Sequence, residues 1–243
     1  MGVGVMYIYA YIKPSVQAII LAGGFGKRLA PLTSETPKPL LTVGGKPILV
    51  RQIEWLKTFG ITDIILAVGY LRHKIFEVLG DGRKLGVRIF YSVEEEPLGT
   101  GGAVKNASIF LEEDPFVVVN GDVLTNLSVV KMAESLGDAD GAIALVPLRS
   151  PYGIVEFDGE GFITRFREKP VLEGFYINAG VYVLRRRIIE ELPDRGNIEE
   201  TLFPRLAQQK RLKAVVFKDV FWRSVDSLKD LEEVDKFFGG NEH

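Results

Sequence analysis

The stretch LAGGFGKRL fills residues 21–29 and continues the apolar run QAIILA at 17–22. The apolar run, bounded by glycine, predicts a buried strand. Gly23, Gly24 and Gly26 then predict a loop in which no side chain shields the backbone N–H groups from a phosphate. We therefore expect the first strand to end at a phosphate-binding loop.

Strands and helices alternate along the first half of the chain. Besides 17–22, the predicted buried strands are 64–68, 87–93 and 116–120, and the predicted helices are 47–59, 71–79 and 101–111. This alternation predicts parallel crossover units and a sheet that helices cover on both faces. The expected fold class is α/β, a Rossmann-like three-layer α/β/α arrangement around a central mixed, mostly parallel sheet.

The second half has a different pattern, because several strand-like segments follow one another there. The predicted strands are 141–148, 152–157, 162–167, 175–184 and 212–217, and the predicted helices are 185–192, 198–209 and 227–238. No linker rich in proline, glycine or serine separates the two halves. We therefore expect a single domain over residues 16–243, preceded by an N-terminal extension at residues 1–15.

Charge and composition exclude several classes of protein. The net charge of -2 gives no sustained positive field, so nucleic acid is not an expected partner. The absence of cysteine excludes disulfides, thiolate metal sites and cysteine nucleophiles, and a count of 2 histidines disfavours a histidine triad. Residues 1–12 are apolar but shorter than a membrane span and lack a cleavage site, so we expect no membrane partner and a cytoplasmic location.

The glycine loop departs from two common phosphate-binding patterns. The P-loop requires serine or threonine after Gly-Lys, whereas Arg28 follows Gly26 and Lys27 here. The dinucleotide pattern requires a third glycine at the position of Leu29. A P-loop nucleotidase and a dinucleotide-dependent oxidoreductase are therefore both disfavoured.

The loop is followed by the cationic side chains of Lys27, Arg28 and Lys38. Pro37 and Pro39 stiffen the chain on both sides of Lys38. An ammonium and a guanidinium near a triphosphate would neutralise the charge that develops on a leaving pyrophosphate. We therefore assign catalytic roles to Arg28 and Lys38.

The same residues carry a resemblance to a known family. The pattern LAGGFGKRLAPLT at 21–33, with PKPLL at 37–41 and GKPI at 45–48, resembles the sugar-1-phosphate nucleotidyltransferases. Within this family, the motifs of the chain most resemble those of the guanylyltransferases for mannose 1-phosphate or heptose 1-phosphate. The resemblance implies the nucleotidyltransferase fold and transfer of a nucleotidyl group from a nucleoside triphosphate to a sugar 1-phosphate, with release of pyrophosphate. Lys27 is a small departure, since many members have threonine or serine there.

The resemblance also implies which residues bind the nucleotide. Glu94 opens the segment EEEPLGTGG at 94–102, which contacts the nucleobase in the family. A carboxylate only accepts hydrogen bonds, so it suits the paired N–H donors of guanine and favours GTP. The expected nucleotide-binding residues are Leu21, Ala22, Gly23, Gly24, Gly26, Lys27, Arg28, Lys38, Glu94, Gly99 and Thr100.

A magnesium site is expected at Asp122 and Asp226. Asp122, which we also count as catalytic, follows the strand at 116–120, at the sheet edge where ligands of open α/β folds bind. The family takes its second carboxylate from a Trp-X-Asp segment, but Ser224 holds that position here. In an extended segment, positions two apart project to the same face, so we expect Asp226 to replace the missing carboxylate. The alternative is that Asp226 caps the helix beginning near Ser227.

The sugar phosphate is expected on three later segments, by the same resemblance. They are YGIV at 152–155, EKP at 168–170 and NAG at 178–180. The expected sugar-phosphate-binding residues are Gly153, Glu168, Lys169 and Asn178.

Two alternatives to a guanylyltransferase stay open. One is a non-catalytic regulatory subunit that binds a nucleotide sugar, which the serine at position 224 suggests. The other is a nucleotidyltransferase that uses UTP, dTTP or CTP with a different sugar or an alcohol phosphate. Members of the family commonly associate, so a homo-oligomer is a further expectation.

Overall fold

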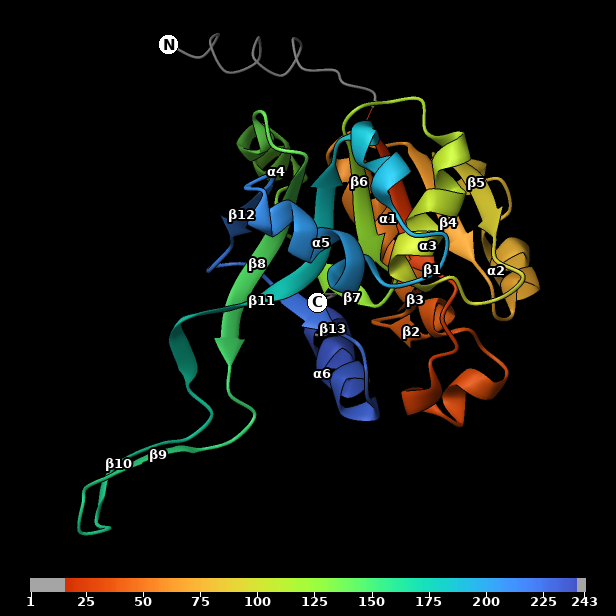
Figure 1. The fold of residues 1–243 in the computed structure, drawn as a ribbon. Coiled ribbons are helices and arrows are strands. Elements are labelled where there is room, and N and C mark those ends of the chain that lie inside the picture. Colours follow the sequence, from red (N-terminus) through yellow and green to blue (C-terminus); the bar gives the residue numbers. More distant parts are fainter. Residues whose placement is uncertain (1–15, 240–243) are drawn as a thin grey trace, which may run out of the picture.

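The computed structural model describes residues 16–239, and its centre is one seven-stranded sheet (Figure 1). The strands lie in the order β12-β8-β11-β6-β1-β4-β5. Their bounds are β1 (Gln17–Ala22), β4 (Asp63–Val68), β5 (Arg88–Val93), β6 (Phe116–Asn120), β8 (Gly141–Arg149), β11 (Val171–Leu184) and β12 (Leu212–Val216). The predicted extension at residues 1–15 lies outside the described residues.

Most neighbouring strands in this sheet are parallel. β1 pairs in parallel with β4 and β6, β4 pairs with β5, and β8 pairs with β12. β11 runs antiparallel to both of its neighbours, β6 and β8. The expected mixed, mostly parallel sheet is therefore confirmed.

Helices cover both faces of the sheet, because successive side chains of a strand point to opposite faces. In β1, Ile20 packs into the core on one face and Ile19 into the core on the other. The first face is covered by α1 (Ile48–Thr58), α2 (Arg72–Leu79) and α4 (Val129–Leu136), and the second by α3 (Gly99–Ala107) and α5 (Ile198–Gln208). This is the expected three-layer α/β/α arrangement.

The end of the described chain packs against the segment that follows the glycine loop. Helix α6 (Leu228–Gly239) lies on the short hairpin of β2 (Thr42–Val43) and β3 (Lys46–Pro47). Val234 of this helix shares a third apolar cluster with Leu29 from the loop. The position of α6 is therefore coupled to the position of the loop.

Several short elements differ from the sequence prediction. Segment 185–192, predicted as a helix, is a 3₁₀ helix, η6 (Arg186–Glu191), which ends before Leu192 because Pro193 disfavours helical backbone at that residue. The unpredicted elements include α4, β7 (Val123–Thr125) and β13 (Trp222–Ser224). The two strands are too short for a periodicity to identify them, whereas the buried Val129, Met132 and Leu136 of α4 do recur at helical spacing. None of the helices in residues 16–239 is both long and apolar enough to cross a bilayer.

The predicted strands at 152–157 and 162–167 do not join the central sheet. They are β9 (Ile154–Phe157) and β10 (Ile163–Arg167), which pair only with each other in an antiparallel hairpin. This hairpin continues β8 and β11 beyond the body of the molecule (Figure 1). We call residues 150–170 the arm.

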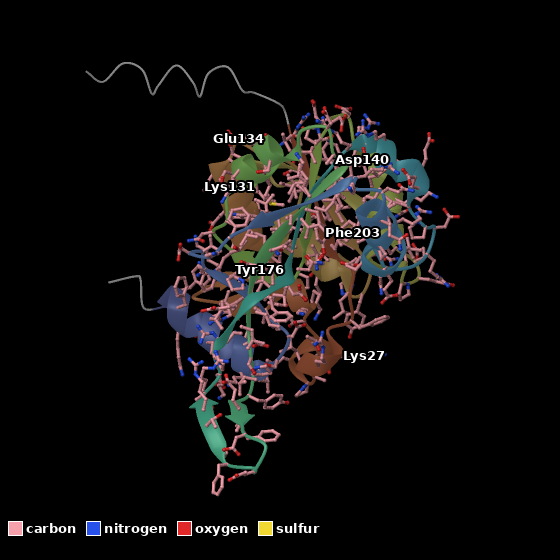
Figure 2. All side chains as sticks on the ribbon, turned by 60° about the vertical axis from the view of Figure 1, so that its left-hand side comes forward. Lys27, Lys131, Glu134, Asp140, Tyr176 and Phe203 are labelled. Carbon is pink, nitrogen blue, oxygen red and sulfur yellow. The ribbon has the colours of Figure 1, made fainter. Side chains whose placement is uncertain are left out.

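Asp140 gives a test of what holds the second half of the sheet together (Figure 2). Its buried carboxylate is paired with the partly exposed Arg187 and Arg211. Asp140→Ala is expected to lower the free energy of unfolding by about 2 kcal/mol, less than at a fully buried pair because both arginines reach water. Glu54→Ala, which breaks an exposed pair with Lys46, should change it by less than about 1 kcal/mol. Urea unfolding measures both.

The same variant should alter the pH dependence of stability. Burial acts to raise the pKa of Asp140, but the hydrogen bonds and charges of Arg211 and Arg187 lower it below the ordinary 3.8. The stabilisation is therefore complete above that ordinary pKa and is lost as the pH falls through the lowered folded-state value. Equal acid sensitivity of Asp140→Ala and the unmodified protein would contradict this.

Candidate active site

A pocket of about 410 Å³ opens where β1 and β6 end. The glycine loop forms one wall, and the turns after β6 and β13 form another. Its lining residues are Leu21, Ala22, Gly23, Gly24, Phe25, Gly26, Lys27, Arg28, Leu29, Lys38, Pro39, Glu94, Pro97, Gly99, Thr100, Ala103, Asn120, Gly121, Asp122, Asn197 and Asp226. All the residues predicted to bind the nucleotide or the metal therefore lie in one cavity.

At one position, the glycine loop has a left-handed backbone conformation that only glycine adopts without strain. Gly26 has φ +62°, and its carbonyl accepts from Thr33 Oγ1 at 2.9 Å and from Leu29 N at 2.9 Å. A Cβ at Gly26 would lie 2.9 Å from Thr33 Cγ2 and 3.0 Å from Lys38 Cβ. The glycine thus lets the loop close against the segment that carries Lys38.

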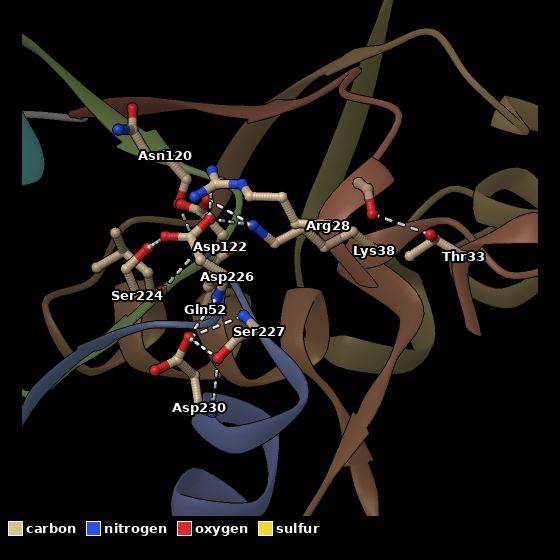
Figure 3. A network of polar contacts seen from close by, with 12 residues as sticks. Arg28, Thr33, Lys38, Gln52, Asn120, Asp122, Ser224, Asp226, Ser227 and Asp230 are labelled. Carbon is tan, nitrogen blue, oxygen red and sulfur yellow. Dashed lines mark hydrogen bonds and ion pairs between the residues drawn. The ribbon is translucent and has the colours of Figure 1, made fainter. Parts of the chain in front are cut away.

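Lys38 lies between the two predicted metal carboxylates (Figure 3). Its Nζ donates to Asp122 Oδ2 at 2.7 Å and to Asp226 Oδ1 at 3.1 Å, and only 13% of its side chain is exposed. Arg28 reaches the same Asp226 oxygen at 2.8 Å, with 77% of its side chain exposed. Arg28 is therefore free to turn toward a ligand, whereas Lys38 is held in place.

The backbone places the two carboxylates side by side. β13 pairs antiparallel with β7, with Ser224 opposite Val123. Just beyond this pairing, Val225 N donates to the carbonyl of Asp122 at 2.9 Å. A short strand pairing therefore brings Asp226 to Asp122 from the far end of the chain.

Ser224 supports Asp226. Its Oγ donates to Asp226 Oδ2 at 2.6 Å, so the two side chains share a face as expected for alternate positions. Burial acts to raise the pKa of Asp226, but this hydrogen bond and the charges of Lys38 and Arg28 outweigh it and lower that pKa. The carboxylate is therefore kept ionised, the form a metal ion requires.

The alternative role of Asp226 as a helix cap is wrong. Ser227 caps α6, since its Oγ accepts from Asp230 N at 3.2 Å. The carboxylate of Asp230 returns to Ser227 N at 2.8 Å, which completes a reciprocal cap. The carboxylate of Asp226 therefore takes no part in the cap and lines the pocket.

The oxygen atoms present fit a hard divalent cation. Asp122 and Asp226 supply carboxylates, and the buried amide oxygen of Asn120, another lining residue, has no partner among the described residues. Magnesium prefers such oxygen ligands and usually adds substrate phosphates and water. Within residues 16–239, no group of three or more Asp, Glu, His or Cys side chains is placed so that it could hold a metal ion.

Glu94 lines the pocket beside the glycine loop. Its Oε2 accepts from Leu98 N at 3.2 Å, and burial raises its pKa despite that bond. Gly23 leaves it room, because a Cβ there would lie 2.8 Å from Glu94 Oε1. Next to it, Thr100 donates its hydroxyl to Glu199 and accepts from Ile198 N at 2.9 Å. This joins the start of α3 to the start of α5.

The predicted sugar-phosphate residues are not gathered in the pocket. Gly153, Glu168 and Lys169 are on the arm, and none lines the cavity of their own chain. Asn178 lies nearer, because its Nδ2 donates to Tyr182 Oη at 2.8 Å and Tyr182 Oη donates to Glu199 at 2.9 Å, beside Thr100. Asn178 is therefore linked to the pocket only indirectly, through Tyr182 and Glu199.

Some lining residues were missed by sequence reasoning. Asn120 ends β6 two positions before Asp122, and its carbonyl accepts from the buried Gln52 Nε2 at 2.8 Å. Asn197 precedes α5 and is near the nucleotide segment because Thr100 N donates to its Oδ1 at 3.4 Å. The position of Asn120 at a strand end was a usable signal, whereas no local pattern marks Asn197.

The fold and this cavity define an α/β protein with a glycine loop, two cations beside it and a pair of carboxylates, an arrangement that a nucleotidyltransferase would use. The chain belongs to the nucleotidyl transferase family, which it matches over residues 17–239.

Curated relatives share more than a third of the aligned residues. The chain is 38% identical over 226 residues to "Probable mannose-1-phosphate guanylyltransferase 1" of Oryza sativa subsp. japonica, covering 88% of this chain and 62% of the relative. It is 39% identical over 226 residues to "Mannose-1-phosphate guanyltransferase" of Candida albicans, with the same two shares. The chain thus spans less than two thirds of the length of these relatives.

Solved structures match over nearly their whole length. HddC from Yersinia pseudotuberculosis superimposes with TM-score 0.74 at 32% identity, over 92% of this chain and 99% of that one. The same protein is also solved complexed with GMP-PN. A putative glucose-1-phosphate thymidylyltransferase from Bacillus anthracis matches with TM-score 0.76 at 22% identity, over 94% and 97%, and supports the fold alone.

Gly26 and Gly24 form a matched pair of positions for testing the loop. Gly26→Ala should lower the free energy of unfolding by about 1–2 kcal/mol, because alanine is strained at positive φ. An added Cβ at Gly24 meets nothing within 4 Å, so Gly24→Ala should leave stability within about 0.5 kcal/mol. Thermal and urea unfolding measure both variants. Equal losses of stability would contradict the strain expected at Gly26.

Proposed function

We propose that this protein transfers a guanylyl group from GTP to a sugar 1-phosphate, of the mannose or heptose type, and releases pyrophosphate. The observation that carries the proposal is the position of Lys38, held between Asp122 and Asp226 beside a glycine loop. The names of the rice and Candida relatives and the GMP-PN complex of HddC support the choice of base.

The reaction we propose is a single in-line displacement. A phosphate oxygen of the sugar 1-phosphate attacks the α-phosphorus of GTP, and the bond from that phosphorus to the pyrophosphate oxygen breaks. No covalent intermediate with the protein is required. The role of the chain is to orient both substrates and to neutralise charge, as in other phosphoryl transfers.

Lys38 and Arg28 have distinct parts in this displacement. Lys38 is fixed by its carboxylate partners, so it suits the α-phosphate, whose position must not vary. Arg28 is largely exposed and suits the leaving pyrophosphate, which it follows as the bond breaks. Backbone N–H groups of Gly23 and Gly24 are open to the remaining phosphates.

Magnesium is the cofactor we propose, held by Asp122 and Asp226. When bound, it supplies positive charge to the phosphate oxygens and lowers the repulsion against an anionic nucleophile. The lowered pKa of Asp226 keeps this ligand ionised at neutral pH.

The catalytic assignments are tested by pyrophosphate release with GTP and mannose 1-phosphate or heptose 1-phosphate. Lys38→Ala, Asp122→Asn and Asp226→Asn should each lower kcat/KM at least about 100-fold, since each removes a charge at the reacting phosphates. Asp219→Asn, at an exposed carboxylate outside the pocket, should keep the unmodified rate. Full activity of the pocket variants would refute the assignment. Tight nucleotide-sugar binding without turnover would instead favour a regulatory subunit.

Glu94 is expected to select the base. Glu94→Gln should lower kcat/KM for GTP by roughly 10- to 100-fold, because a charged acceptor for two guanine N–H donors is lost. The relative rate with UTP or dTTP should rise. Since burial raises the pKa of Glu94 above the ordinary 4.5, KM for GTP should rise as the pH falls through that raised value. The glutamine variant should lack this dependence, and an unchanged base preference would contradict the role.

A further inference from the structure

The arm stands clear of the rest of the molecule (Figures 1 and 2). Its hairpin has one apolar face, because residues directly opposite in an antiparallel pair point the same way. Val155 lies opposite Phe166, and Phe157 lies opposite Ile163. Phe157 is 72% exposed and Phe166 is 61% exposed. The other face has the ion pair of Arg167 with Glu156 at 3.2 Å.

An amphipathic hairpin of two strands is not stable alone in water, and a clustered aromatic surface marks a contact site. The chain's own body does not provide the contact. β8 and β11 pair from Gly141 opposite Leu184 outward to Arg149 opposite Val171, with register shifts in β11 at 171–176 and 178–182. At the start of the arm, Ser150 N donates to Pro170 O at 2.9 Å. This ladder directs the arm away from the body.

The pocket has none of the predicted sugar-phosphate residues in its lining. The residues that line it belong to the nucleotide and metal side, and none comes from the arm, all of which is described. At the mouth, Phe25 is 44% exposed. The cavity therefore has an apolar edge and no assigned sugar-phosphate groups beyond it.

The arm carries a preformed polar end. A Cβ at Gly153 would lie 3.0 Å from Glu168 Oε2 and 2.9 Å from Phe166 Cζ, so the glycine allows these side chains to pack together. Lys169 has φ +43°, a left-handed backbone conformation that is uncommon for lysine. Glu168 and Lys169 are therefore held at the base of an apolar face.

We propose that the arm of one copy packs on a second copy of this chain and that its Glu168 and Lys169 complete the sugar-phosphate side of that copy's pocket. The proposal rests on the proposed function for the identity of the ligand. A twofold axis would make the exchange reciprocal, so each dimer would hold two complete sites. The apolar face would then be covered at the mouth of the partner's pocket.

Mixed dimers test whether the site is shared. Lys38→Ala and the double variant Glu168→Ala, Lys169→Ala are co-expressed with different affinity tags and purified over both. Each variant alone should be inactive, whereas the mixed dimer has one undamaged site and should reach about half of the wild-type rate. A mixed dimer with no more activity than its parents would overturn the proposal, as would a wild-type protein that is an active monomer.

Cross-linking gives a readout that does not depend on activity. Because the chain has no cysteine, Lys169→Cys in one tagged copy and Lys27→Cys in another supply unique thiols. A short bis-maleimide should join the two copies. Lys210→Cys, which precedes β12 and so lies at the opposite edge of the sheet, should not be joined. Absence of the first cross-link, or an equal yield with Lys210→Cys, would overturn the proposal.

The arm's apolar face is tested in the same assay. Phe157→Asp with Phe166→Asp should abolish the cross-link and the dimer, whereas Ile109→Asp, at an exposed residue outside the arm, should keep both. If the wild type forms the arm-dependent dimer but releases no pyrophosphate with any substrate pair, the proposed function fails while the docking stands. If it is active and the cross-link is absent, the function stands and the docking fails.

Discussion

The ion-paired cluster of Lys38, Asp122 and Asp226 is the constraint on which the site depends. Lys38 is separated by 84 residues from one carboxylate and by 188 from the other, yet its ammonium contacts both. A partly buried ammonium is stable only with opposite charges nearby, and paired carboxylates need a cation between them. The cluster therefore ties the glycine loop, the central sheet and the C-terminal helix to one point, where a phosphate group would lie.

The parallel sheet explains why that point lies where it does. β1 and β6 are neighbours and run in the same direction, so the glycine loop and the turn at Asp122 emerge at one edge. The pairing of β13 with β7 brings Asp226 to the same edge, and the hydroxyl of Ser224 holds it there. A chain can thus shift a carboxylate by two positions and keep its charge in the site, because the strand still presents the same face.

The arm follows from the same sheet by a different route. β11 runs antiparallel between β6 and β8, so its pairing with β8 can extend past the edge of the body as a two-stranded ribbon. The ribbon extends beyond the hydrophobic core of the chain, so the apolar and charged side chains of the arm stay exposed. The arm has an apolar face next to its polar pair, Glu168 and Lys169, and the pocket has the exposed ring of Phe25 next to its polar groups. This match is why we relate the arm and the pocket across two copies.

The sequence by itself determined the alternating strands and helices, the glycine loop, the cations after it and the place of Glu94 in the same pocket. Each depends on residues close together in the chain, where glycine, proline and apolar periodicity act locally. Short strands such as β7 and β13 lacked a readable period. Only the tertiary structure decided that Ser227 caps α6 and leaves Asp226 to Lys38, that Asn197 joins the pocket, and that Glu168 and Lys169 stand away from it. These outcomes depend on pairing between segments distant along the chain, which no local pattern encodes.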